Sequence, residues 1–427
     1  MAQNQLPYPP SGDNQGRPPS LLEALFNAID SIARKLVHFA PLGRSIRGAM
    51  SSQTDGLISW QHVRDIAVAT LELQGTSFEP IPADEVEGYQ QMLRDSEAQV
   101  GEYTKLTVWG LPEKVEVFNQ RDWIDANIVS FRFLFDPISE RYVRMLEDME
   151  AEQGVKAGKT AQRFARTLLS VQVGVIMGYL SRNVLGQFDL SLPEPEKAGK
   201  LYIVEPNVRR VVTELGVEPR EFRQWITLHE VTHSFEFHCN NWLRPFMMAS
   251  IQDYLNSIDW KNLARPDILR KMRERNTEVS EGDALSAGGL IAIVMTPEQR
   301  AILARLQAVM SVLEGYSNHV MDQVGMTLLP SYDQMKLRFE HRRETKSGAE
   351  KLFQRLIGLN LKLEQYRIGQ KFVDAVVSAE GLEFMNHAWE NAERMPTLDE
   401  IHNPSAWIAR IKTGGAPARL RLVPNPN

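Results

Sequence analysis

The residues of this chain whose types and spacing best suit chemistry form the run His229-Glu230-Val231-Thr232-His233. If this run is helical, the two histidines are about 40° apart around the helix axis and about 6 Å apart along it. Two imidazoles so placed can converge on one metal ion, and neutral imidazole is a good zinc ligand. Glu230, rotated by about 100° from His229, would lie beside the zinc and could take a proton from a zinc-bound water.

The surrounding residues predict that this run lies in a helix with both histidines on the inward face. Glu218-Pro219 is typical of a helix start, because proline is favoured in the first turn and an acidic residue suits the helix dipole there. The residues that share the face of the histidines, at spacings of three or four, are apolar or aromatic: Phe222, Trp225, Ile226 and Phe237. Two core histidines that make only hydrogen bonds are the alternative interpretation.

A catalytic zinc site of this type needs a third protein ligand, and Glu314 is the best candidate. It follows a strong helix start, Thr296-Pro297-Glu298-Gln299, in which a Thr N-cap, a first-turn Pro and a Gln at the third position combine. Apolar residues then lead up to it at helical spacing: Ile302, Leu306, Met310 and Leu313. A carboxylate at the end of such a stripe faces the core, where it is costly unless it is paired or bound to metal. Two His and one Glu form the ligand set of thermolysin-like zinc enzymes.

Other ligands remain open. Glu314 could instead pair with a buried Arg, and His319 or Asp322 on the same helix could replace it. His319 points about 140° away from Glu314 on an ideal helix, so the two are not expected to bind together. His238 and Cys239 follow the motif without the Gly turn that a third ligand from this region needs, and Cys239 is better interpreted as a small buried apolar residue.

Three residues near Glu314 are candidates for supporting roles around the metal. Asn318, one turn later, could orient the carboxylate of Glu314 by a hydrogen bond. Tyr316 and His319 could stabilise an oxyanion by hydrogen bonding. Their alternative role is ordinary core packing.

Composition narrows the classes of protein that this chain can represent. The chain has 427 residues, 43% of them hydrophobic, which allows a large core. A net charge of -6 argues against nucleic-acid binding, which needs clustered Lys and Arg. With a single cysteine no intrachain disulfide can form, and we expect a cytoplasmic protein. The apolar stretch 167–186 is interrupted by Gln172 and Arg182, so we expect a buried helix and no membrane span.

The patterns predict a mainly α fold with a small β component. Helices are expected over 21–39, 59–74, 86–102, 121–153, 160–185 and 352–381, and strands over 186–192 and 200–204. Residues 103–118 alternate apolar and polar side chains and predict a strand or hairpin. Residues 388–410 predict a turn-rich cap. We expect a disordered Pro-rich tail over 1–20, a single domain over 21–412 and a frayed tail over 413–427.

Several segments together resemble a family of bacterial zincin-like proteins. They are Gly178-Tyr179-Leu180-Ser181, Val184-Leu185-Gly186-Gln187-Phe188-Asp189, Leu201-Tyr202, Pro206-Asn207, His229-Glu230-Val231-Thr232-His233, Met295-Thr296-Pro297-Glu298-Gln299-Arg300, Leu313-Glu314-Gly315, Pro396-Thr397 and Pro404-Ser405-Ala406-Trp407. Members of this family are labelled hydrolases or zinc-dependent metalloproteases, and some are associated with coenzyme F420 biosynthesis. Tyr316 departs from the His that many relatives have at this position.

The resemblance implies a zincin-like metallopeptidase fold with His229, His233 and Glu314 at the zinc. It is most simply read as a zinc-dependent hydrolase, a peptidase or a small-molecule amidase, with Glu230 as general base. The alternative is a catalytically silent zincin scaffold that binds metal or a partner. The sequence does not constrain the oligomeric state.

Overall fold

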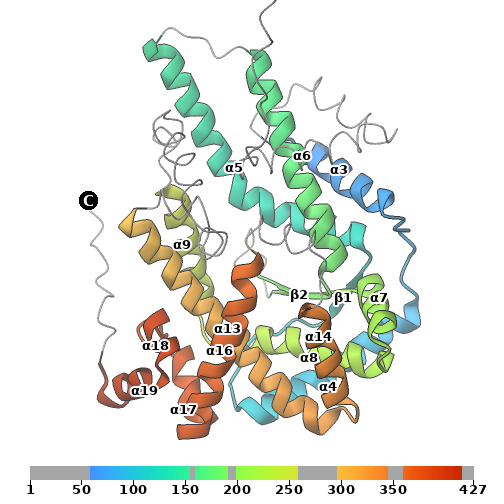
Figure 1. Ribbon diagram of the computed structural model, residues 1–427, viewed down its shortest axis with the longest axis vertical. Coiled ribbons are helices and arrows are strands. Elements are labelled where there is room, and N and C mark those ends of the chain that lie inside the picture. The colour runs from blue at the N-terminus through green and yellow to red at the C-terminus, as the bar shows by residue number, and fades with distance from the viewer. Residues whose placement is uncertain (1–57, 154–158, 191–198, 258–295, 345–358, 416–427) are drawn as a thin grey trace, which may run out of the picture.

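The computed structural model describes residues 58–153, 159–190, 199–257, 296–344 and 359–415 (Figure 1). Most of these residues are helical and three short strands form one sheet, which confirms the predicted fold class. The elements are α3 (Trp60–Leu73), α4 (Ala83–Thr104), β1 (Val115–Phe118), α5 (Gln120–Gln153), α6 (Lys159–Asn183), β2 (Gly186–Asp189), β3 (Lys200–Val204), α7 (Glu205–Leu215), α8 (Pro219–His238), α9 (Leu243–Asn256), α13 (Pro297–Leu328), α14 (Tyr332–Glu344), α16 (Leu359–Glu380), α17 (Leu382–Met385), η1 (Asn386–Trp389), α18 (Leu398–His402) and α19 (Pro404–Thr413).

Some predictions fall on residues outside these ranges. The tail over 1–20, the helix over 21–39 and most of the tail over 413–427 lie outside the described residues. The single domain over 21–412 stays a prediction. Among the described residues, the predicted helices lie close to where the patterns placed them, whereas α7, α9 and α14 were not predicted.

The sheet has the order β1-β3-β2, with β1 parallel and β2 antiparallel to β3. The strand predicted over 103–118 is much too long, since only its last four residues form a strand. Helix α4 continues to Thr104, Lys105 takes a left-handed conformation (φ 57°) and Gly110 another (φ 68°). Such residues break an extended run, so pairing with β3 begins only at Val115.

The sheet separates two packed groups of helices. Leu201 and Ile203 of β3 belong to a large core that includes side chains of α4, α8 and α13. Val204, which faces the other side because strand side chains alternate, belongs to a smaller core with α3, α5 and α6. In Figure 1 the latter helices lie above the sheet, and α8 and α4 lie below it. One consequence is that α8 is held directly against the sheet.

Glycines allow two helix pairs to approach closely. A Cβ on Gly174 of α6 would be 2.8 Å from Cβ of Ile66 in α3. A Cβ on Gly315 of α13 would be 2.3 Å from the carbonyl carbon of Gly369 in α16. Gly315 therefore lets α13 and α16 approach closely next to Glu314.

The two helices that carry the predicted ligands begin as their sequences predict. The side chain of Glu218 caps α8 by accepting the N–H of Glu221, and Pro219 is in the first turn. Thr296 and Gln299 form a complete capping box at the start of α13. These caps satisfy backbone N–H groups that have no partner within the helix and fix where each helix begins.

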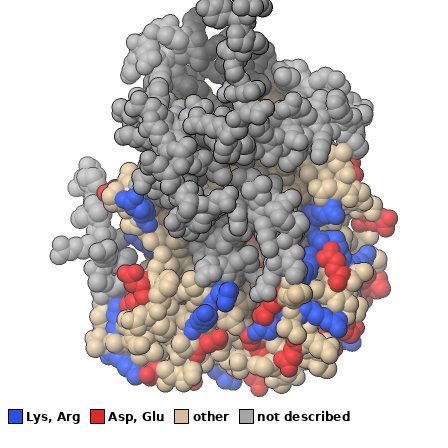
Figure 2. All heavy atoms as spheres, viewed as in Figure 1, with Lys and Arg blue, Asp and Glu red and all other residues tan. Residues whose placement is uncertain are grey.

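Within the described ranges, no helix has both the length and the apolar character of a membrane span, α6 included. On the face shown in Figure 2, acidic and basic side chains are interspersed over the described surface.

Candidate metal centre

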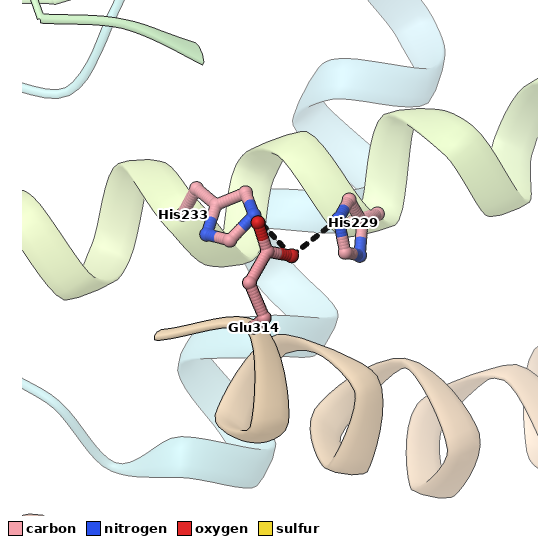
Figure 3. A group of neighbouring side chains, drawn as sticks. All are labelled: His229, His233 and Glu314. Atoms are coloured by element: carbon pink, nitrogen blue, oxygen red, sulfur yellow. Dashed lines mark ion pairs between the residues drawn. The ribbon is translucent and has the colours of Figure 1, made fainter. Parts of the chain in front are cut away.

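Three predicted ligands converge between α8 and α13. His229 and His233 project from α8, and Glu314 projects toward both from α13 (Figure 3). Oε2 of Glu314 is 3.8 Å from Nε2 of His229 and 3.7 Å from Nε2 of His233. The two imidazole rings are nearly perpendicular, with centroids 4.7 Å apart. Residues 85 positions apart in sequence thus meet at one point.

This donor set fits a zinc ion. Ligand atoms 2.0–2.2 Å from a tetrahedral zinc are about 3.3–3.6 Å apart, so both distances to Glu314 are within a few tenths of an ångström of the expected value. Each of the three residues offers a ligand atom, and all of these atoms lie within 4.8 Å of one another. Two imidazoles and one carboxylate are donors that zinc favours, and they leave one tetrahedral position open.

Glu230 lies beside this trio, between α8 and the edge strand β2. It is almost fully buried (7% exposed), and its carboxylate accepts the backbone N–H of Phe188. In the absence of a metal, burial raises the pKa of Glu230 to about 7, Glu314 acts in the same direction, and His233 and the Phe188 N–H oppose it. The space for the carboxylate exists because position 186 is a glycine, whose hypothetical Cβ would be 2.6 Å from Cγ of Glu230.

Glu236 contacts the centre and was missed by the sequence analysis. It is fully buried, and its Oε2 is 2.7 Å from Nδ1 of His233. Ser317 of α13 donates a hydrogen bond of 3.3 Å to Oε1 of Glu236. Burial alone would lower the pKa of His233, but Glu236 and Glu314 together raise it well above its ordinary value. The available signal was a carboxylate between Phe235 and Phe237, three residues after His233.

Tyr316 and His319 are not brought to the trio. The hydroxyl of Tyr316 donates to Oδ1 of Asn386, and the fully buried ring packs edge-on against Trp389. His319 faces away from Glu314 and lies between Tyr103 and Asp374, with ring nitrogens 2.8 and 2.7 Å from their oxygens. Both side chains thus hydrogen-bond away from the trio, and their role at an oxyanion stays a prediction.

His238, Cys239 and Asp322 do not belong to the convergent group found among the described residues. Asp322 binds Tyr332, Lys336 and Gln370 through its carboxylate. Nδ1 of His238 lies 2.7 Å from the carbonyl oxygen of Ser234. Cys239 is half-buried at the end of α8, with its thiol directed to the carbonyl of Glu236. Asn318 is half-buried one turn after Glu314, and its orienting role stays a prediction.

Comparison with known proteins agrees with this arrangement. A model of the zincin-like metallopeptidase family matches residues 58–408. A crystal structure from Chloroflexus aurantiacus, described as that of a candidate hydrolase with a novel fold, is 36% identical and has a TM-score of 0.60. The similarity covers 83% of this chain and 99% of that one. A comparison with proteins of curated function finds no match. The chain belongs to the zincin-like metallopeptidase family, and its three convergent ligands lie within the matched residues.

Proposed function

We propose that this protein is a zinc-dependent hydrolase of peptide bonds, with His229, His233 and Glu314 as the zinc ligands. The observation that carries the proposal is the convergence of two histidines from α8 and one carboxylate from α13, with Glu230 buried at their side. A closed structural zinc site uses four protein ligands, whereas a catalytic site keeps one position open. Among the residues that the structure describes, three candidate ligands converge beside one further carboxylate, and this set favours catalysis.

The residues divide the chemistry among them. Zinc, when bound, supplies a Lewis acid that polarises a carbonyl and lowers the pKa of water. Glu230 accepts the proton that the attacking water loses and later donates it to the leaving nitrogen. Because Glu230 is held from one side by the Phe188 N–H, its carboxylate has a defined position next to the ligands. The rings of His229 and His233 must be neutral, with Nε2 unprotonated, to bind the metal.

The substrate class rests on the family and its solved relative. The family is described as metallopeptidases and the solved relative as a candidate hydrolase, so a peptide is the first substrate to test and a small amide the second. We also propose a cytoplasmic location, since a chain with one cysteine has no intrachain disulfide that would need an oxidising compartment.

The proposal is tested by metal analysis and by cleavage of a peptide library followed by mass spectrometry. We expect one zinc per wild-type chain, loss of zinc in His229→Ala, and zinc without cleavage in Glu230→Gln. Glu221→Gln is the matched control, because Glu221 lies on the same helix and binds Ser331. Wild-type protein without stoichiometric zinc would overturn the proposal. Full cleavage by Glu230→Gln would remove Glu230 as the base, and zinc without any cleavage of peptides or amides would indicate a catalytically silent site.

A further inference from the structure

We infer that Glu236 is a positioning residue for the metal centre, which fixes the tautomer of His233 and ties the two ligand-bearing helices together. This inference rests on the proposed zinc site. It assigns a role to a side chain that is neither a ligand nor the general base. Glu236 lies three residues after His233 on α8, and it is fully buried.

The first part of the inference follows from proton placement on His233. Its Nδ1 is 2.7 Å from Oε2 of Glu236, and an ionised carboxylate can only accept a hydrogen bond. With an ionised Glu236, Nδ1 of His233 carries a proton and its N–H donates a hydrogen bond to Oε2 of Glu236. In the neutral ring this leaves the lone pair on Nε2, the nitrogen that lies 3.7 Å from Oε2 of Glu314. The contact thus selects the tautomer that can bind a metal at the trio. It also raises the basicity of Nε2, which makes the imidazole a stronger metal ligand.

The second part follows from the other oxygen of the same carboxylate. Oε1 of Glu236 accepts a hydrogen bond of 3.3 Å from Ser317, which lies on α13 three residues after Glu314. Oγ of Ser317 is also 3.1 Å from Nδ1 of His233. One buried carboxylate therefore connects a ligand of α8 to the helix that supplies the third ligand. A change at Glu236 should alter both the orientation of His233 and its distance from Glu314.

The burial of Glu236 supports a role beyond packing. A fully buried carboxylate is costly unless its oxygens are hydrogen-bonded, and here Oε2 contacts the predicted ligand His233 and Oε1 contacts Ser317 on the neighbouring helix. An apolar residue would fill this volume without that cost. We take the use of a carboxylate here as a requirement of the metal centre.

The test compares zinc affinity by chelator competition and the absorption spectrum of the cobalt-substituted protein. Glu236→Gln keeps the shape of the side chain but removes its charge, and we expect about 10–100-fold weaker zinc binding and a changed cobalt spectrum. Ser317→Ala removes only the link to α13, and we expect a smaller loss of a few-fold. Glu221→Gln, on the same helix but hydrogen-bonded to Ser331, should leave both readouts unchanged. The unfolding midpoint of each metal-free variant shows that the fold is kept.

The outcomes separate this inference from the proposed function. If the wild-type protein binds no zinc, the proposed function fails and this inference fails with it. If the wild type binds zinc and Glu236→Gln has the same affinity and the same cobalt spectrum, only the positioning role is overturned. If Glu236→Gln does not fold, Ser317→Ala decides, and unchanged affinity and spectrum in that variant overturn the inference.

Discussion

Gly186 and Glu230 lie so close together that a Cβ atom on Gly186 would be 2.6 Å from Cγ of Glu230 and 2.7 Å from its Oε1. Gly186 begins the edge strand β2, and its backbone is not in the left-handed region. The requirement for glycine at this position is therefore steric and comes from the carboxylate of Glu230. We therefore count Gly186 as part of the proposed catalytic arrangement, because it makes room for the carboxylate of the proposed general base.

Replacing Gly186 by alanine should displace Glu230 without removing the metal. The new methyl group would force the carboxylate away from its position, and a displacement of about 1 Å in a catalytic group can reduce turnover about 100-fold. We expect Gly186→Ala to keep its zinc content and lose most of its peptide hydrolysis. Gly88→Ala in α4 is the control, since no atom lies within 4 Å of its hypothetical Cβ. Equal hydrolysis by the two variants would contradict the steric argument.

Replacing Gly369 by alanine should weaken both the fold and the metal site. A Cβ on Gly369 would be 1.8 Å from the carbonyl oxygen of Ser311, which is backbone and cannot turn aside. Helix α16 must then move away from α13. The clash is at Ser311, three residues before Glu314, so the movement should also disturb the position of that ligand candidate. Overpacking of this kind costs about 1–3 kcal/mol. Urea unfolding should show this loss in Gly369→Ala, and chelator competition should show a weaker zinc affinity. Gly88→Ala should show neither loss, since alanine is favoured over glycine inside a helix and its Cβ meets no neighbour.

The trio could be predicted from the sequence because each of its members is marked by local patterns. His229 and His233 are four residues apart on a helix with a recognisable start, and Glu314 follows an apolar stripe. Their meeting between α8 and α13 is a long-range property, and only the chemistry of zinc pointed to it. The family resemblance implies the same grouping of the two segments.

Gly186 and Glu236 escaped prediction for a physical reason. The role of Gly186 depends on how β2 lies against α8, and no local pattern encodes the register of an edge strand against a helix. Glu236 resembles any charged residue near a helix end until its burial is known. The overlong strand over 103–118 failed in the same way, because alternation continues through residues that find no partner strand.

The single thiol of the chain should react slowly in the folded state. Burial raises the pKa of Cys239 to about 12, Glu236 adds to the shift, and Asn240 opposes it. At pH 8 only about one thiol in 10,000 would be ionised, compared with about one in four at the ordinary pKa of about 8.5. Iodoacetamide should therefore label the folded protein far more slowly than the urea-unfolded protein.

The same shift has a consequence for stability. Because the pKa of Cys239 is higher in the folded state, the protonated thiol contributes to stability below about pH 8.5, and this contribution is lost as the pH rises toward 12.

The same pKa governs labelling, because the thiolate is the reactive form. The labelling rate of the folded protein should therefore keep rising with pH above 10. Equal labelling rates for folded and unfolded protein at pH 8 would contradict the burial of this thiol.

Replacing Glu205 by glutamine should destabilise the protein more than replacing an exposed acidic residue. Glu205 is fully buried at the start of α7, where Nη2 of Arg223 lies 2.5 Å and Nε of Arg209 3.0 Å from its Oε1, and where it accepts the hydroxyl of Tyr89. Arg223 lies on α8, so this carboxylate also links α7 to the helix that carries His229 and His233. Removing the charge of Glu205 leaves the guanidinium of Arg223, which is only 21% exposed, without its counter-ion. We expect the free energy of unfolding to fall by about 3 kcal/mol.

The comparison for this prediction is Glu214→Gln. Glu214 also pairs with two arginines, Arg210 and Arg342, but its side chain is 41% exposed. Exposed pairs contribute about 1 kcal/mol or less, since water replaces the lost partner. Urea unfolding at pH 7 should therefore give a much larger loss for Glu205→Gln than for Glu214→Gln, at equal dependence of the free energy on urea concentration. Similar losses in both variants would show that the buried network around Glu205 does not hold α8 in place.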